Sequence, residues 1–239
     1  SELAKLAAIF FVAALLERRI HRINDVGYAL TPIGLMLGCL VGLIMLEPDL
    51  GTTIVVVLTT GTLVFVAGAS LTHLAAFGGV ATIAASMLIA AGGYRADRIF
   101  AFINAEDDPS GRGFQTLQLL IALGSGGIRG LGLGASRQKF FYVPGAHTDG
   151  VFAIIGEELG FIGLLGILAL FAFFVLRGLK ATFATKDQFG TLLGIGIVSW
   201  IAYQTLINVG GITRSIPLTG VPLPFLSYGG SALLAMLAG

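Results

Sequence analysis

The sequence contains little charge and a single cysteine. Only 11% of its residues are charged and the formal net charge is +1, whereas soluble domains carry about 25% charged residues. The balanced charge and the lack of a polybasic arm give no sign of nucleic-acid binding. Cys39 stands in an apolar run, which excludes a disulfide framework and a cysteine-based metal cluster. What is left is an apolar chain, 56% hydrophobic with a mean hydropathy of +0.93, as in integral membrane proteins.

Long apolar runs divide the chain. Six are complete and a seventh reaches the last residue, and most approach or exceed the ~20 residues that cross a bilayer. We therefore predict an all-α polytopic membrane protein, a helical bundle that forms one membrane-embedded domain over residues 1–239. A basic cluster follows the first run instead of preceding it, so the run is not a signal peptide and we expect earlier spans to be missing. The predicted spans are 3–16, 30–46, 52–69, 74–93, 151–176, 189–209 and 231–239.

The short connections indicate the orientation. Arginines cluster at 18–22, and basic residues recur at 177–186. The positive-inside rule places both connections in the cytoplasm and the long loop 94–150 outside. Within that loop, residues 114–123 are apolar and helical in character, so we expect a helix that lies at the interface or re-enters the protein.

Asp149 is the first residue to suspect of chemistry. It ends the polar loop as a lone carboxylate, just before the apolar run that begins at Val151. A substrate whose tail is in lipid can reach it there, whereas deeper in the bilayer the charge would cost about 2.5 kcal/mol or more. His147, two residues earlier, could shuttle protons or could be a hydrogen-bonded loop histidine.

Three further acids have structural alternatives. Glu157 and Glu158 lie about two helical turns beyond Asp149 on different faces of the predicted helix, so both cannot face the same cavity. We expect at least one of them to pair with a cation or donor on a neighbouring helix as a buried polar clamp, although a functional role stays open. Asp49 could cap the helix that follows it or could contact a substrate.

The long loop is rich in cations and in glycine. Arginine forks bind phosphate at two points and lysine supplies a point charge, so the set favours an anionic substrate; a solvated loop face is the alternative for each member. The glycine-rich run 124–134 could cradle phosphate through backbone N–H groups, but it lacks the Gly-Lys-Ser/Thr ending of a P-loop, so a flexible turn is favoured. The cations are Arg95, Arg98, Arg112, Arg129, Arg137 and Lys139.

Prolines interrupt the last outer segment. Pro217, Pro222 and Pro224 precede Ser227-Tyr-Gly-Gly-Ser231. Non-helical backbone at membrane depth persists only where protein or a cavity satisfies its polar groups. We therefore predict that this segment forms a wall of the site.

Short motifs follow one another along almost the whole chain. They are Ser1-Glu-Leu-Ala-Lys5, Pro48-Asp-Leu-Gly-Thr52, Tyr94-Arg95 with Arg98, Gly113-Phe-Gln115 with Gln118, Gly124-Ser-Gly-Gly127, Gly132-Leu-Gly134, His147-Thr-Asp149, Gly156-Glu-Glu-Leu-Gly160, Asn208-Val-Gly210 and Leu223-Pro-Phe-Leu-Ser-Tyr-Gly-Gly-Ser231. In this order they resemble the SEDS family of shape, elongation, division and sporulation proteins, the FtsW and RodA type. The pattern from Lys139-Phe-Phe-Tyr-Val-Pro144 to Asp149 favours the FtsW (division) branch. The sequence departs from the family pattern at Gly145, where Glu is common, and at Ala105 and Leu119, which replace Pro and Ser.

The resemblance implies a peptidoglycan glycosyltransferase of the bacterial plasma membrane. It would polymerise lipid II with undecaprenyl pyrophosphate as leaving group, beside a class B penicillin-binding protein and other proteins of the division or elongation machinery. Such a leaving group needs cations more than a proton donor, so one general base and a basic patch suffice. We assign the base to Asp149, and one carboxylate suits inversion at the anomeric carbon. The predicted substrate-binding residues are Lys139, Arg98, Arg95, His147, Gln115 and Ser227.

Two functions of other classes stay open. A lipid II flippase would line a path through the bilayer with ionisable groups, for which Glu157 and Glu158 are the candidates. A non-catalytic scaffold would only activate its partner. No cofactor is required by the sequence; Mg²⁺ or Mn²⁺ could bridge the pyrophosphate and Asp149, although no ligand cluster demands a metal.

Overall fold

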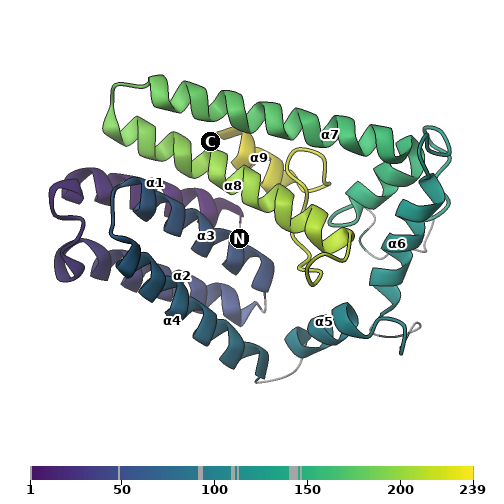
Figure 1. The fold of residues 1–239 in the computed structure, drawn as a ribbon, viewed down its shortest axis with the longest axis horizontal. Coiled ribbons are helices and arrows are strands. Elements are labelled where there is room, and N and C mark those ends of the chain that lie inside the picture. Colours follow the sequence, from purple (N-terminus) through teal and green to yellow (C-terminus); the bar gives the residue numbers. More distant parts are fainter. Residues whose placement is uncertain are drawn as a thin grey trace. The chain divides into compact units, whose positions relative to one another are not determined.

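The structure, a computed structural model, describes residues 2–47, 49–90, 94–108, 111, 113–139, 145 and 147–238, without side chains at 84–85, 88–90 and 94–97. The described residues form helices joined by turns and irregular segments, with no strand among them, which confirms the all-α class. Two short helical turns, η1 (Ile20–Arg22) and η2 (Val26–Leu30), join the first two helices. The helices are α1 (Glu2–Arg19), α2 (Thr31–Leu46), α3 (Leu50–Val66), α4 (Leu71–Ala90), α5 (Tyr94–Ile103), α6 (Phe114–Gly126), α7 (Val151–Ala184), α8 (Gln188–Ile212) and α9 (Gly230–Ala238) (Figure 1).

Three helical segments among the described residues are long and apolar enough to cross a membrane. They are Val26–Leu46, Val151–Ala184 and Gln188–Ile212, and shorter apolar helices occupy Leu50–Val66 and Leu71–Ile83. Charged residues at both ends shorten the apolar part of α1, which carries Glu2 and Lys5 at one end and residues 17–19 at the other. The chain is thus a multi-pass membrane protein, and its total of seven spans and their orientation stay predictions.

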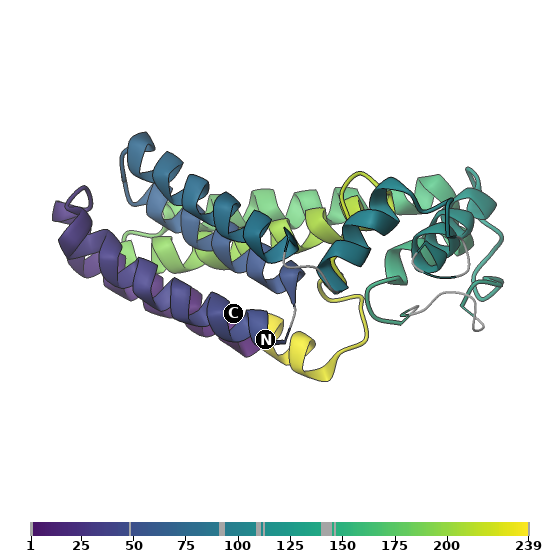
Figure 2. The ribbon, with the colours of Figure 1, turned by 90° about the horizontal axis from the view of Figure 1, so that it is seen from below.

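The chain divides into two compact units. The first contains Ser1–Ala91, Phe174–Tyr203 and Leu237–Gly239, and the second contains Gly92–Phe173 and Gln204–Met236. In the first unit α3 packs against α1, α2 and α4 (Figures 1 and 2). Asp49 begins α3 by accepting a hydrogen bond from the Thr52 amide at 2.9 Å, so it has the capping role that the sequence allows.

Small residues let α8 approach its neighbours in the first unit. A Cβ atom at Gly196 would overlap Ile9 of α1 and press on Leu63 of α3, which is the close packing that glycine permits between membrane helices. Lys5 is buried in the same unit, where it pairs with Glu2 at 2.6 Å and its Nζ lies 5.5 Å from the centre of the Trp200 ring. The ion pair and the ring compensate the burial of this charge.

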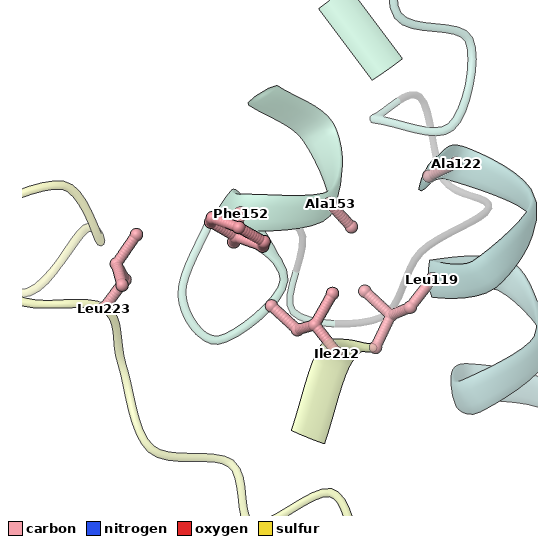
Figure 3. Close-up of a cluster of buried hydrophobic side chains, with 6 residues drawn as sticks. All are labelled: Leu119, Ala122, Phe152, Ala153, Ile212 and Leu223. Carbon is pink, nitrogen blue, oxygen red and sulfur yellow. The ribbon is translucent and has the colours of Figure 1, made fainter. Parts of the chain in front are cut away.

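The second unit has an apolar core of its own. Leu119 and Ala122 of α6 face Phe152 and Ala153 at the start of α7, and Ile212 and Leu223 close the cluster (Figure 3). The core therefore joins α6, the first turns of α7, the end of α8 and the proline-rich segment that follows it. It positions the elements that carry the predicted site residues.

Helix α7 is broken at Gly160. Its φ of 68° and ψ of −170° separate a short segment, 151–159, from the long segment 161–184. The run 127–134 supplies the hydrogen bonds that the break removes. Leu131 N and Gly132 N donate to the carbonyls of Glu157 and Glu158, and Phe161 N and Ile162 N donate to the carbonyls of Gly127 and Ile128, at 2.9 to 3.2 Å. The glycine-rich run contains turns, as the sequence predicted, and it forms a hydrogen-bonded clasp on the helix break.

Alanine at Gly160 should destabilise the protein. The positive φ costs a residue with a Cβ about 1–3 kcal/mol, and that Cβ would overlap the backbone of Gly130 and Ile128. Gly166 of the same helix is the matched control, because a Cβ there meets nothing within 4 Å and alanine is favoured in a helix by up to ~1 kcal/mol. We expect a lower unfolding midpoint in detergent for Gly160→Ala only. Equal midpoints for both variants would contradict the role of the break.

Candidate active site

Asp149 lies in a tight turn that leads into α7. Thr148 N and Gly150 N both donate to the Gly145 carbonyl, at 3.0 and 2.9 Å, and the Gly150 carbonyl accepts the first helical hydrogen bonds from Ala153 and Ile154. Gly145 has a φ of 70°, and a Cβ on it would overlap Asp149 Oδ1. The absence of a side chain at 145 therefore leaves the space that this rotamer of Asp149 occupies.

Two side chains orient the Asp149 carboxylate. Gln115 Nε2, from the first turn of α6, donates to Oδ2 at 3.3 Å, and Thr148 Oγ1 donates to Oδ1 at 3.0 Å. The carboxylate is half-buried and lies near the N-terminal end of a helix, where the helix dipole favours negative charge.

The backbone on which Asp149 stands is pinned at three successive carbonyls. Tyr228 N donates to the His147 carbonyl at 2.8 Å. Ser227 Oγ donates to the Thr148 carbonyl at 2.5 Å, and Asn208 Nδ2 donates to the Asp149 carbonyl at 2.9 Å. The three donors come from α8 and from the segment after it, so elements distant in sequence fix the position of this turn.

Asn208 joins the turn to the proline-rich segment. Its Nδ2 also donates to the Val221 carbonyl at 2.7 Å, while its buried Oδ1 has no hydrogen-bond partner among the described residues. Gln204, one helical turn earlier, donates to the Pro222 carbonyl at 3.0 Å, and Ser227 Oγ accepts from Leu223 N at 2.7 Å. These bonds satisfy the non-helical backbone, as the predicted wall of the site requires.

An open cavity of about 640 Å³ adjoins the turn. It is lined by His147, Val151, residues 226–230 and Leu233. Asp149 is not among its lining residues, but it follows His147 in the same pinned turn. His147 and Ser227 are therefore the predicted substrate residues that border the cavity, and Gln115 contacts the carboxylate itself.

Arg98 lies against the proline-rich segment. Its Nη1 donates to the Leu218 carbonyl at 2.5 Å, and its guanidinium approaches Gly220. Arg214, which was not selected from the sequence, fixes the other end of α5 by donating to the carbonyls of Phe102 and Ile103 at 3.0 and 3.2 Å. The two arginines hold α5 against the segment that Asn208 and Ser227 join to Asp149.

Glu157 is a buried acceptor for the loop that follows the clasp. It is 1% exposed and accepts from Ser136 Oγ, Arg137 N and Gln138 N at 2.5, 3.1 and 3.3 Å. The donors belong to a loop and two of them are backbone amides, whereas a cation or donor on a neighbouring helix was expected from the sequence.

Glu158 pairs with Lys139. Lys139 Nζ lies 2.8 Å from Glu158 Oε1 and also donates to the Gly134 carbonyl at 2.9 Å. Ser136 N donates to the same carboxylate oxygen at 3.4 Å. Both acids of α7 thus engage residues 134–139, because this loop wraps around the end of the short helical segment.

The predicted site residues fall into two groups. Gln115, His147 and Ser227 gather at Asp149, whereas Lys139 sits with Glu158 near the helix break. Arg112 and the side chain of Arg95 lie outside the described residues. Asn208 and Gln204 were missed as site residues, although two amides at i,i+4 in an apolar helix are a signal of buried polar contact. Among the described residues, no group of three His, Cys, Asp or Glu side chains could hold a metal ion.

Leucine at Glu157 should lower stability more than glutamine. Leucine leaves the donors of Ser136, Arg137 and Gln138 without an acceptor, at about 1–3 kcal/mol for each buried group. Glutamine keeps one side-chain oxygen as an acceptor, so only some of these three donors lose their partner. Glu106→Leu is the control, since this acid is 81% exposed in its pair with Arg214 and such pairs contribute about 0–1 kcal/mol. Thermal unfolding in detergent gives the order, and a parental midpoint for Glu157→Leu would refute the clamp.

Comparison with known proteins covers the whole chain. Residues 1–239 match the FtsW/RodA/SpoVE family, described as cell cycle proteins. Stage V sporulation protein E of Bacillus subtilis is 44% identical over 238 residues, which are 99% of this chain and 65% of that protein. A probable peptidoglycan glycosyltransferase FtsW of Trichlorobacter lovleyi is 39% identical over 237 residues, 99% of this chain and 62% of the relative. The chain thus spans less than two thirds of these relatives.

Solved structures share the fold. A peptidoglycan synthase complex, described for its coordination of polymerization and crosslinking, contains a chain with a TM-score of 0.77 and 29% identity, over 99% of this chain and 66% of that one. RodA of Thermus thermophilus, a rod shape determining protein, matches with a TM-score of 0.63 and 32% identity, over 99% of this chain and 61% of that one. The helices, the ordered motifs and these matches agree: the chain belongs to the SEDS family of membrane proteins, the FtsW, RodA and SpoVE type.

Proposed function

We propose that the complete protein is a peptidoglycan glycosyltransferase that polymerises lipid II and releases undecaprenyl pyrophosphate. Relatives named probable peptidoglycan glycosyltransferases support this proposal. The observation that carries it is the placement of Asp149, whose backbone is pinned at three carbonyls beside an open cavity. A fixed carboxylate next to an accessible space is what a general base requires.

The reaction needs one proton acceptor. The hydroxyl oxygen of the acceptor sugar attacks the anomeric carbon of the donor, and its proton passes to the Asp149 carboxylate. The bond between the anomeric carbon and the pyrophosphate oxygen breaks, and its electron pair leaves with the pyrophosphate. Gln115 and Thr148 orient the two carboxylate oxygens. Direct attack with one carboxylate inverts the anomeric configuration, whereas retention usually requires a second acid as nucleophile.

The leaving group requires positive charge. Lys139, Arg98 and Arg95 are the proposed ligands of the pyrophosphate, by charge-assisted hydrogen bonds. The charge of Lys139 is already neutralised by Glu158. The pyrophosphate would therefore share Lys139 with that carboxylate or take its place. The described side chains contain no group of three His, Cys, Asp or Glu residues that could hold a metal by itself, but Mg²⁺ commonly binds through one or two carboxylates together with substrate phosphates. Asp149 would hold such an ion together with the substrate.

The proposed partner is a class B penicillin-binding protein, a transpeptidase with one membrane span. The similar chain in a peptidoglycan synthase complex supports this pairing. The proposed setting is the bacterial plasma membrane with loop 94–150 on the outer side, in division or shape maintenance with other proteins of that machinery. The description of the family as cell cycle proteins supports division, and the name of the rod shape determining relative supports shape maintenance.

A flippase requires ionisable groups along a path through the bilayer. Glu157 and Glu158 were the candidates, and both are engaged with the loop 134–139. This arrangement favours the enzyme over the flippase for these two acids. A scaffold function has no observation of its own in its favour.

Replacement of Asp149 by asparagine should abolish polymerisation. The variant keeps the shape of the side chain but cannot take up a proton, and general-base catalysis contributes roughly 10²–10⁴-fold. The measurement is glycan polymerisation from lipid II by the purified full-length protein with its partner. Asp107→Asn, at an exposed acid of the same loop, is the control and should be fully active. A parental rate for Asp149→Asn, with folding and partner binding intact, would show that the base is elsewhere.

Loss of the Lys139 charge should weaken substrate use. Glutamine removes a charge-assisted bond worth about 1.5–3 kcal/mol, which corresponds to roughly 10–150-fold in kcat/KM. It also leaves Glu158 unpaired. The double variant Lys139→Gln/Glu158→Gln removes that imbalance, so it should recover stability but not kcat/KM if Lys139 binds the pyrophosphate. Recovery of both would reduce Lys139 to a structural partner.

A further inference from the structure

The clasp 127–134 presents apolar side chains away from the protein. Ile128 and Leu133 are 69% and 81% exposed, and Leu131 is also exposed. Glycines with positive φ alternate with them, at 127, 130, 132 and 134. These turns direct the backbone polar groups toward α7 while the intervening side chains face outward. Exposed apolar side chains that gather in one short segment mark a contact with a membrane or a partner.

The backbone of the clasp is adapted to little water. Gly130 N donates to the Gly126 carbonyl, and four further backbone bonds join residues 127–132 to the break in α7. Non-helical backbone at membrane depth requires such internal partners, whereas a loop in water can use solvent. Two independent features, exposed apolar side chains and backbone groups that bond to the break in α7, therefore indicate the same environment.

The clasp also has a defined depth. After the break, the uncharged residues 161–176 form a segment about 24 Å long at ~1.5 Å per residue, which crosses most of the ~30 Å hydrocarbon core. Only 6% of the most apolar stretch of Val151–Ala184 is buried within the protein, and Phe161 and Ile162, just after the break, are exposed. Because Gly127 and Ile128 are bonded to Phe161 and Ile162, the clasp lies at the end of the lipid-facing span.

We propose that residues 127–134 are seated in the lipid at one membrane interface, with Ile128, Leu131 and Leu133 inserted at the boundary between headgroups and acyl chains. The occupant of this apolar surface is lipid, because the surface continues the lipid-facing side of the span. Arg129, exposed between them, is placed to reach lipid phosphates, as basic side chains do at interfaces. The expected insertion is roughly 5–10 Å.

Depth-dependent quenching tests the proposal without any enzymatic turnover. In full-length protein in which Cys39 and any cysteine outside residues 1–239 are replaced by alanine, Leu133→Cys is labelled with a polarity-sensitive fluorophore. The protein is then placed in vesicles of phosphatidylethanolamine and phosphatidylglycerol. Spin-labelled lipids with shallow or deep quenchers are added. Leu170→Cys, on the exposed lipid side of α7, is the lipid reference, and Asp107→Cys, in the exposed polar loop, is the water reference.

We expect the label at 133 to lose more fluorescence to the shallow quencher than to the deep one. Before labelling, the thiol of Leu133→Cys should react more slowly with a charged maleimide than the thiol of Asp107→Cys does. Ile128→Cys should give the same result and guards against a local effect of one substitution. Quenching no greater than at position 107 would overturn the proposal, whether water, another part of the chain or a partner protein covers the surface.

Discussion

The break in α7 is the constraint on which the arrangement of the second unit depends. A helix that stops within an apolar segment leaves amide and carbonyl groups that must find partners inside the protein. The chain meets this requirement with the clasp 127–134, which supplies acceptors and donors on both sides of Gly160. Gly126 and Gly130 allow the approach, because a Cβ at either would overlap the backbone of α7. The break thereby fixes α6, the clasp and the short segment 151–159 as one assembly.

That short segment is held at both ends. At its C-terminal end, Glu157 accepts hydrogen bonds from residues 136–138 and Glu158 pairs with Lys139. At its N-terminal end, Asn208, Ser227 and Tyr228 pin three carbonyls of the Asp149 turn. Each such bond contributes only about 0.5–1.5 kcal/mol, but together they allow little movement of the Asp149 backbone. A base held in this way needs little reorganisation when a substrate arrives.

The sequence predicted the helices, which depend on local composition. It missed the features that depend on contacts between residues far apart in the chain. Apolar length indicated the helices, so the predicted 189–209 falls within α8 and 114–123 within α6. The break at Gly160 was not predicted, because an isolated glycine is tolerated in a helix and its positive φ depends on a clasp some thirty residues earlier. Asp149 was selected from its position at a polar–apolar boundary, and its role as the base stays a prediction. The partners of Glu157 could not be found, since two of them are backbone amides that every residue possesses.

The depth of the break sets a limit on the depth of Asp149. From residue 160 back to residue 151 the helical segment is about 14 Å long at ~1.5 Å per residue, and the two-residue turn before it adds at most ~7 Å, so Asp149 lies at most ~21 Å from the break in whatever direction they point. If the clasp lies at the membrane interface, Asp149 is within that distance of the lipid headgroups, and Lys139, bonded to Glu158 and to the Gly134 carbonyl, is at their level. A lipid-linked substrate carries its pyrophosphate at the same level and its sugars beyond it. The cation would then meet the leaving group while the carboxylate meets the sugar, which is the order of charges that the proposed reaction requires.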